Sequence, residues 1–192
     1  MQIEQFVMAY GVEQDRLRAI LPDDFESLRP VLRINAEIRD GRIGYVEFNT
    51  AVKAQGKRGW LNIGKWENVL FTRDGEQVIF ELPFLQISFV GVGIAGSCPA
   101  EKDNDGCFFF GENITLREPE LILANKEFCD CEFSWRFHEN DAHGVSIGKT
   151  LPAIPTEIIK VYPKQPFTVQ NAATIPCQQV LGTYKVSFER IR

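Results

Sequence analysis

One short segment combines a lysine with closely spaced carboxylates: residues 98–107, with the sequence CPAEKDNDGC. It has three interpretations. Lys102 could attack a carbonyl group, the acidic side chains could bind a metal ion, or the segment could be a polar turn. Glu101 and Asp103 flank Lys102 and favour its protonated form, whereas an amine that attacks a carbonyl must be uncharged. Lys102 is kept as a candidate catalytic residue, but Asp-Asn-Asp-Gly is strong turn chemistry and favours a structural turn.

The acidic residues of this segment also match part of a calcium-binding loop. Four carboxylates and a glycine fall at positions 1, 3, 5, 12 and 6 of such a loop: Glu101, Asp103, Asp105, Glu112 and Gly106. Apolar strand-like stretches flank them, whereas an EF-hand needs helices on both sides. We therefore expect no metal ion, and a turn or an active-site loop remains as the interpretation.

A second candidate lies in residues 43–52, IGYVEFNTAV, which alternate as a β-strand does. Val46 and Phe48 share one face, and Tyr45 and Glu47 share the other. Alternation alone is typical of a solvent-facing glutamate. The alternative is that Glu47 is an acid or base in a site and that Tyr45 contacts the same ligand.

Lys65 is a further candidate catalytic residue. It lies between Trp60 and Trp66 and alternates with Leu61 and Ile63, which would direct it toward an apolar interior. Removal from water would lower its pKa and allow imine formation. An ordinary surface lysine is the alternative. Trp60 is the aromatic residue that we expect to contact the ligand.

Many short strands must position these residues. The chain contains 15 Phe, 15 Gly and 10 Pro, a composition typical of strands joined by tight turns. Residues 72–82 predict a hairpin that turns at Asp74-Gly75, and residues 182–191 predict a last strand with Tyr184, Val186 and Phe188 on one face. Helical spacing is limited to residues 13–22 and 118–128. The predicted fold class is mainly β with a few short helices (α+β).

The cysteines predict a structural role. There are 5, an odd number, which argues against a secreted disulfide framework. Cys129 and Cys131 alternate with charged residues in residues 127–137, so both thiols belong to the apolar face of a strand. No Cys-x2-Cys pair is present for zinc. We expect no cofactor.

Composition excludes several classes of partner. The chain has 192 residues, 44% hydrophobic and 24% charged, and a net charge of −5. These values predict one globular domain over residues 1–192. No basic run suits a nucleic acid or an anionic membrane, no segment is apolar enough to cross a bilayer, and residues 1–10 do not match a signal peptide. We expect a cytoplasmic protein.

Three stretches, residues 6–34, 44–63 and 162–191, together resemble the acetoacetate decarboxylase-like family. The first, FVMAYGVEQDRLRAILPDDFESLRPVLRI, has the family's strand ending in Tyr, its short helix and its Leu-Pro. The second, GYVEFNTAVKAQGKRGWLNI, has the Tyr-x-Glu strand, a polar turn and an aromatic-led strand. The third, YPKQPFTVQNAATIPCQQVLGTYKVSFERI, has the rhythm of the closing segment. The resemblance covers about the first 65 and the last 30 residues.

The resemblance implies a β-cone or barrel with a central small-molecule cavity, in a homo-oligomer. It also implies that Glu47 faces this cavity near the reacting carbonyl. In the family, a lysine in a Tyr-Pro-Lys-Lys motif forms a Schiff base with an oxo acid, which requires a lowered lysine pKa. The sequence contains no Pro-Lys-Lys, and Lys102 lies three residues after Pro99, so the chain resembles a divergent member.

Three functions therefore remain open. The first is a lyase-type enzyme of the decarboxylase, aldolase or dehydratase kind that acts on a small oxo acid or related carbonyl compound. The second is a non-catalytic small-molecule-binding protein that kept the cavity and lost the Schiff-base chemistry. The third is a subunit that only assembles with a partner.

Overall fold

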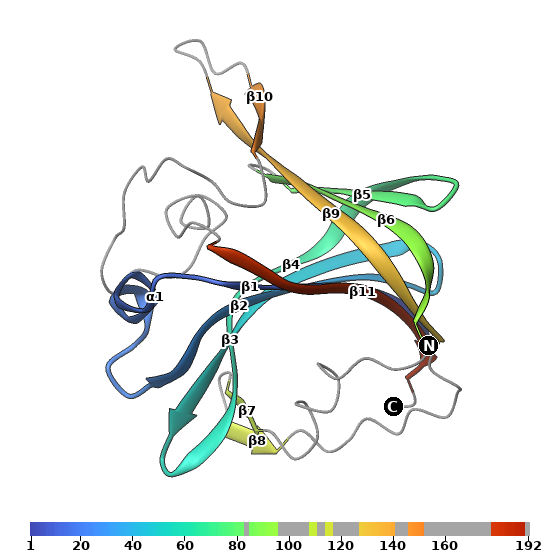
Figure 1. The fold of residues 1–192 in the computed structure, drawn as a ribbon. Helices are drawn as coiled ribbons and strands as arrows, with labels where there is room; N and C mark the ends of the chain where they lie inside the picture. Colours follow the sequence, from blue (N-terminus) through green and yellow to red (C-terminus); the bar gives the residue numbers. More distant parts are fainter. Residues whose placement is uncertain are drawn as a thin grey trace.

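A single curled β-sheet dominates the protein (Figure 1). The structure is a computed structural model, which describes residues 1–82, 85–95, 108–110, 114–116, 127–140, 146–151 and 178–190. The elements in chain order are β1 (Gln2–Gly11), α1 (Gln14–Ile20), β2 (Glu26–Arg39), β3 (Ile43–Ala54), β4 (Lys57–Asp74), β5 (Gln77–Glu81), β6 (Leu85–Ala95), β7 (Phe108–Phe110), β8 (Ile114–Leu116), β9 (Glu127–Asn140), β10 (Ser146–Leu151) and β11 (Gln179–Glu189).

The strand pairings run in a closed circuit. The order is β3-β2-β1-β11-β9-β6-β5-β4, and β3 also pairs with β4. Strand β10 pairs with β9, and β7 and β8 extend the sheet beyond β4. All pairings are antiparallel except that between β4 and β7. The predicted mainly β, barrel-like fold is confirmed.

The circuit closes through the long strand β4, which changes partner along its length. Its part from Lys57 to Val69 pairs with β3, and its part from Leu70 to Asp74 pairs with β5. The register with β3 shifts between Gly44 and Tyr45, and Asn68 lies beside this shift with a φ of 56°. Asparagine is one of the few residues that tolerate this left-handed conformation.

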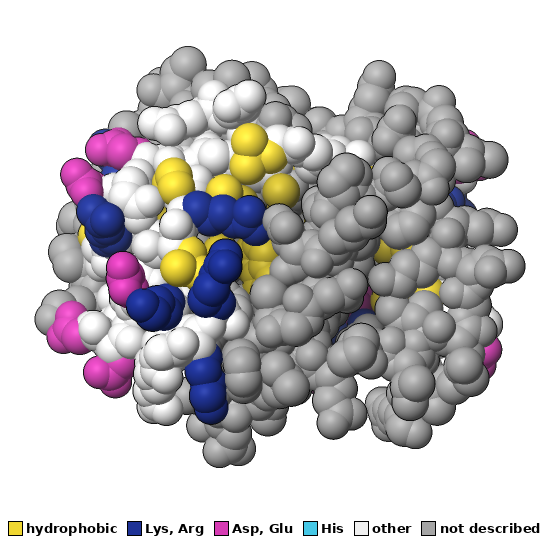
Figure 2. Space-filling model, turned by 60° about the horizontal axis from the view of Figure 1, so that its bottom comes forward, with side chains coloured by type: hydrophobic (Ala, Val, Ile, Leu, Met, Phe, Trp, Pro, Cys, Tyr) yellow, Lys and Arg dark blue, Asp and Glu magenta, His cyan; other side chains and the backbone are white. Residues whose placement is uncertain are grey.

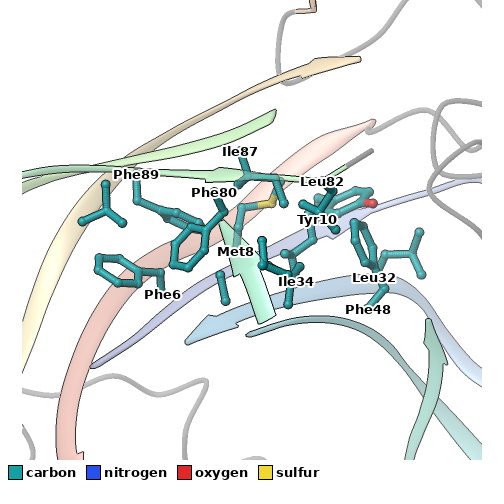
Figure 3. Close-up of a cluster of buried hydrophobic side chains, with 14 of the residues drawn as sticks. Phe6, Met8, Tyr10, Leu32, Ile34, Phe48, Phe80, Leu82, Ile87 and Phe89 are labelled. Carbon is teal, nitrogen blue, oxygen red and sulfur yellow. The ribbon is translucent and has the colours of Figure 1, made fainter. Parts of the chain in front are cut away.

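Hydrophobic side chains fill the inside of the circuit (Figure 3). The Phe6 ring of β1 lies 5.7 Å from Phe80 of β5 and 5.3 Å from Phe89 of β6, measured between ring centroids. Strands β2 and β3 add Leu32, Ile34 and further buried side chains. We call the side of β1–β4 that carries this cluster the core face. Among the described residues this inside is a packed core, so the ligand cavity that the family resemblance implies would have to lie on the opposite side of β1–β4.

The helix α1 covers one end of the core. Leu17 and Ile20 lie three residues apart, so both fall on one face of the helix and are buried. The helix ends at Ile20, two residues before Pro22, which cannot continue it. This helix was predicted from the sequence. Most of the second predicted helix, residues 118–126, lies outside the described residues, and Glu127 and Phe128 belong to β9.

Other predicted elements are confirmed. The hairpin turns between Asp74 and Gln77, with Gly75 at a φ of 56°. Strand β11 buries Tyr184, Val186 and Phe188 on one face. Residues 127–137 lie in β9 as predicted, although the side chains of its cysteines lie outside the described part. Within the described residues, no helix is long and apolar enough to cross a membrane.

Candidate active site on the polar face

The side of β1–β4 and β11 that points away from the core carries a dense set of polar residues. We call it the polar face. Antiparallel pairing lines these residues up in three rows across the strands. The rows are Val186-Gln5-Glu37-Tyr45-Glu67, then Tyr184-Val7-Asn35-Glu47-Lys65, then Gly182-Ala9-Arg33-Asn49-Asn62.

Glu47 is the centre of the polar face. Its Oε1 accepts hydrogen bonds from Asn35 Nδ2 at 2.9 Å and Asn49 Nδ2 at 3.0 Å. Its Oε2 accepts from the Tyr45 hydroxyl at 2.7 Å and Asn62 Nδ2 at 3.2 Å. A carboxylate has about four lone-pair sites and no proton to donate. Four donors therefore match its ionised form.

The strand pattern places these donors. Asn35 on β2 lies directly across from Glu47, and Asn62 on β4 lies across from Asn49. Because Ile34 and Phe48 occupy the core face, their chain neighbours must point to the polar face. Glu47 itself is partly buried, so the expectation of a fully solvated glutamate does not hold.

Tyr45 is a buried hydrogen-bond donor to Glu47. Its side chain is 8% exposed, and the Arg39 guanidinium lies 3.8 Å from its ring centroid. Burial raises the pKa of its hydroxyl far above its ordinary value, and the negative charge of Glu47 raises it further. The phenol therefore keeps its proton at neutral pH and remains a donor.

A second carboxylate, Glu37, lies one row away and is 3% exposed. Gln5 Nε2 donates to it at 3.1 Å, Arg39 Nε at 2.7 Å and Arg190 Nη2 at 3.0 Å. Burial alone would raise its pKa, but the positive charges of Arg190 and Arg39 outweigh burial and hold the pKa below its ordinary value. Glu37 is thus an ionised anchor that joins β1, β2 and the end of β11.

The predicted ligand contact Trp60 is buried on β4, with 5% exposure. The Arg33 guanidinium lies 5.4 Å from its ring centroid, and Arg29 lies 5.6 Å from it. Arg33 is also buried and donates to the Tyr184 hydroxyl at 3.0 Å. Arg33, a member of the third row, therefore contacts both the Trp60 ring and the Tyr184 hydroxyl group.

Lys65 lies across from Glu47 in the register of β3 and β4, but its surroundings differ from those expected. Its side chain is 63% exposed, and its Nζ lies 3.9 Å from Glu67 Oε1. Of the two interpretations of Lys65, the structure matches the ordinary surface lysine and not the lysine in an apolar interior. The structure thus brings Glu47, Tyr45 and the backbone of Lys65 together, without a desolvated amine.

The remaining candidates lie outside the described residues. These are Lys102 and the four acidic residues Glu101, Asp103, Asp105 and Glu112. In the part of the chain that the structure describes, no three His, Cys, Asp or Glu side chains group as a metal site.

Sequence reasoning missed the three asparagines and the Glu37 anchor. In residues 31–39, VLRINAEIR, the polar positions alternate with buried apolar ones, a pattern that is also typical of a solvent-facing surface. The missing signal is the register, because only strand pairing shows that Asn35 lies across from Glu47.

Basic side chains gather on this side of the molecule. Figure 2 views it from the side of β7 and β8, and shows Lys and Arg side chains beside hydrophobic ones in the described part. Exposed basic residues of β2, β3 and β4 are Arg29, Lys53, Lys57, Arg58, Lys65 and Arg73. These side chains could pair with an anionic ligand, although the polar face also carries the carboxylates of Glu37, Glu47 and Glu67.

The sequence matches no protein-family model and no curated protein. Solved structures do match. An acetoacetate decarboxylase from Legionella pneumophila is 13% identical, with a TM-score of 0.51 over 99% of this chain and 84% of that chain. A second acetoacetate decarboxylase is 12% identical, with a TM-score of 0.54 over 97% and 83%. An acetoacetate decarboxylase-like enzyme from Sphingomonas wittichii RW1 is 9% identical, with a TM-score of 0.51 over 97% and 87%.

At these identities the likeness concerns the fold and leaves the chemistry open. It extends over 99% of this chain in the first of these matches. The protein has the fold of the acetoacetate decarboxylase-like enzymes.

Proposed function

We propose that the protein binds a small oxo acid or a related carbonyl compound against Glu47 and carries out lyase-type chemistry on it. The observation that carries this proposal is the Glu47 carboxylate, partly buried and fixed by four donors on one face of an acetoacetate decarboxylase-like fold. Basic side chains on the same side of the molecule suit an acidic ligand. The homo-oligomer implied by the resemblance is part of this proposal.

Glu47 acts in this proposal as the group that accepts a proton or faces a developing positive charge. Its longest hydrogen bond comes from Asn62 Nδ2, which also donates to Asn49 Oδ1 at 3.3 Å. A proton donor on the ligand can replace the hydrogen bond from Asn62 to Glu47. The loss of free energy is small because Asn62 keeps its hydrogen bond to Asn49. Tyr45, Asn35 and Asn49 then hold the carboxylate in place, which is the preorganisation that electrostatic catalysis needs.

An amine for imine formation must come from a lysine. Lys65 lies across from Glu47 on the polar face, and its flexible side chain can turn from Glu67 toward Glu47. Lys102 is a second candidate. Lys164 is a third, because Tyr162-Pro163-Lys164 matches the first three residues of the family's Tyr-Pro-Lys-Lys motif. Lys102 and Lys164 both lie outside the described residues.

The alternative function is a small-molecule-binding protein without catalysis. The observation that favours it is the saturation of Glu47, since four donors leave its oxygens fully hydrogen-bonded, as in a structural polar cluster. A subunit that only assembles with a partner is the third function.

Borohydride trapping distinguishes the first two functions. The protein is incubated with acetoacetate or pyruvate, reduced with borohydride and weighed by intact-mass spectrometry. We expect one covalent adduct that maps to a single lysine peptide. Glu47→Gln should reduce trapping at least tenfold, because it replaces one of the two acceptor oxygens with an NH2 group, which cannot accept a hydrogen bond or a proton from the same donors.

Glu26→Gln is the matched control, since Glu26 is an exposed carboxylate on β2, and this variant should trap normally. No adduct, together with a Glu47-dependent thermal shift by the same compounds, would favour the non-catalytic binder. No adduct and no thermal shift would reject both functions, and a protein that is stable only with a co-purifying chain would favour the assembly subunit.

A further inference from the structure

Asn35 has a buried oxygen that the interactions around Glu47 leave unused. Its side chain is 3% exposed, and its Nδ2 donates to Glu47 Oε1 at 2.9 Å. Its Oδ1 is buried and accepts no hydrogen bond from the described residues. Buried polar atoms of native proteins are nearly always paired, so such an oxygen calls for a donor.

The orientation of the Asn35 amide follows from its neighbour. Exchanging nitrogen and oxygen would place the amide oxygen against the Glu47 carboxylate, and two acceptors cannot bond each other. Nδ2 therefore faces Glu47, and Oδ1 points to the other side of the amide. Among the side chains next to Asn35 in the rows, Val7 on β1 offers no donor of its own.

A comparison with Asn49 shows that an unpaired amide oxygen is not general to the asparagines around Glu47. Asn49 also donates to Glu47, at 3.0 Å, but its Oδ1 accepts from Asn62 Nδ2 at 3.3 Å. The two asparagines thus make the same contact to the carboxylate. They differ in whether their own acceptor is already used.

We propose that the ligand carries a hydroxyl group that donates to Asn35 Oδ1, on the carbon next to its carbonyl group. This inference rests on the proposed function and narrows its substrate class to α-hydroxy carbonyl compounds. The nitrogen and oxygen of one amide lie on the same carbon atom. A ligand whose carbonyl group lies beside Glu47 can therefore reach Asn35 with a hydroxyl group on the adjacent carbon, two bonds from the carbonyl carbon.

The hydroxyl group should strengthen binding by about tenfold, since a buried acceptor that gains its donor recovers roughly the free energy of one net hydrogen bond. The oxygen is covered in the ligand-free fold, so the hydroxyl group must displace what covers it. The two members of a ligand pair differ only in this hydroxyl group. Their ratio of affinities therefore measures the net free energy of the contact.

The test measures dissociation constants by calorimetry for two matched pairs, hydroxypyruvate against pyruvate and hydroxyacetone against acetone. The wild-type protein should bind the hydroxylated member about tenfold more tightly. Asn35→Leu, which keeps the side-chain volume, should bring the ratio close to one. Asn49→Leu is the matched control, because it also removes a donor from Glu47, and it should weaken both members while the ratio stays near tenfold.

Equal binding of both members by the wild-type protein would overturn the inference and leave the proposed function standing, with a buried water as the donor to Asn35. A tenfold ratio that persists in Asn35→Leu would also overturn it. Failure of the wild-type protein to bind any of the four compounds would reject the proposed function together with the inference. A ratio lost equally in both variants would assign the discrimination to Glu47 and overturn the role of Asn35.

Discussion

The two carboxylates on the polar face differ in what holds them. Two arginines and Gln5 hold Glu37, which is 3% exposed. Neutral amides and a phenol hold Glu47, which is partly buried. Charge neutralisation by arginine makes Glu37 a poor proton acceptor and a good structural anchor. The donors to Glu47 are uncharged and do not pair its carboxylate with a cation, in contrast to the arginines at Glu37.

The anchor role of Glu37 predicts a pH-dependent stability. Its folded-state pKa lies below the ordinary value of 4.5, so its stabilising effect is complete above about pH 4.5 and is lost as the pH falls through the folded-state value. Glu37→Gln should lower the free energy of unfolding by about 3 kcal/mol at pH 7, because it removes a buried anion and leaves two partly buried arginines without their partner. Urea unfolding of both proteins from pH 7 to pH 3 should show this difference shrinking on the acid side.

Glu26→Gln provides the reference for Glu37→Gln. Glu26 is an exposed carboxylate on β2, the same strand, and its replacement should change stability by less than about 0.5 kcal/mol at any pH. A difference between wild type and Glu37→Gln that stays constant down to pH 3 would show that packing, rather than charge, accounts for the loss.

Among the elements, the fold depends most on β4, which leaves β3 for β5 at Val69 and Leu70. Gly44 makes this exchange possible. A Cβ atom at Gly44 would overlap with the Val69 carbonyl oxygen and would lie 3.3 Å from Phe71 Cδ1. The close approach of two backbones therefore requires glycine at this position.

Gly44→Ala should destabilise the protein by about 3 kcal/mol, because a backbone oxygen cannot move away as a flexible side chain can. Gly182→Ala is the control. No described atom lies within 4 Å of a Cβ at the exposed Gly182 of β11, and its φ is not in the left-handed range, so this change should be neutral or slightly stabilising. Denaturant unfolding of both variants measures the contrast, and similar losses would contradict the crowding argument.

Alternation in the sequence predicted the faces of single strands well. Tyr45 and Glu47 lie on the side opposite Val46 and Phe48, as expected. Alternation could not predict which strands pair or in which register, since these depend on contacts between distant segments. Asn35 and Asn62 reach Glu47 from two other strands, and for this reason the four-donor arrangement was absent from the sequence prediction. The apolar neighbours of Lys65 were misleading for a related reason, because the bulge between Phe48 and Asn49 shifts the pairing of β4.

For the whole molecule, closure depends on the most distant pairing in the described chain. Strands β1 and β11 pair from Gln2↔Glu189 to Gly11↔Gln179. The Met1 amino group also donates to the Arg190 carbonyl oxygen at 3.0 Å, and the Arg190 amide donates to the Met1 carbonyl oxygen at 2.8 Å. The resemblance to a barrel family predicted this closure, whereas composition and alternation predicted only many strands.

Because Met1 and Arg190 are in contact, a short glycine linker can join the two ends without strain, and the chain can be opened elsewhere. Opening it between Gln55 and Gly56, in the exposed turn between β3 and β4, cuts no strand of the circuit. This permuted protein should fold with a loss of about 1–2 kcal/mol, the order of the lost local connection. Opening between Leu181 and Gly182, within β11, interrupts the pairing with β1 and should abolish cooperative unfolding in circular dichroism. Cooperative folding of both permuted proteins would show that continuity of β11 is not needed to close the circuit.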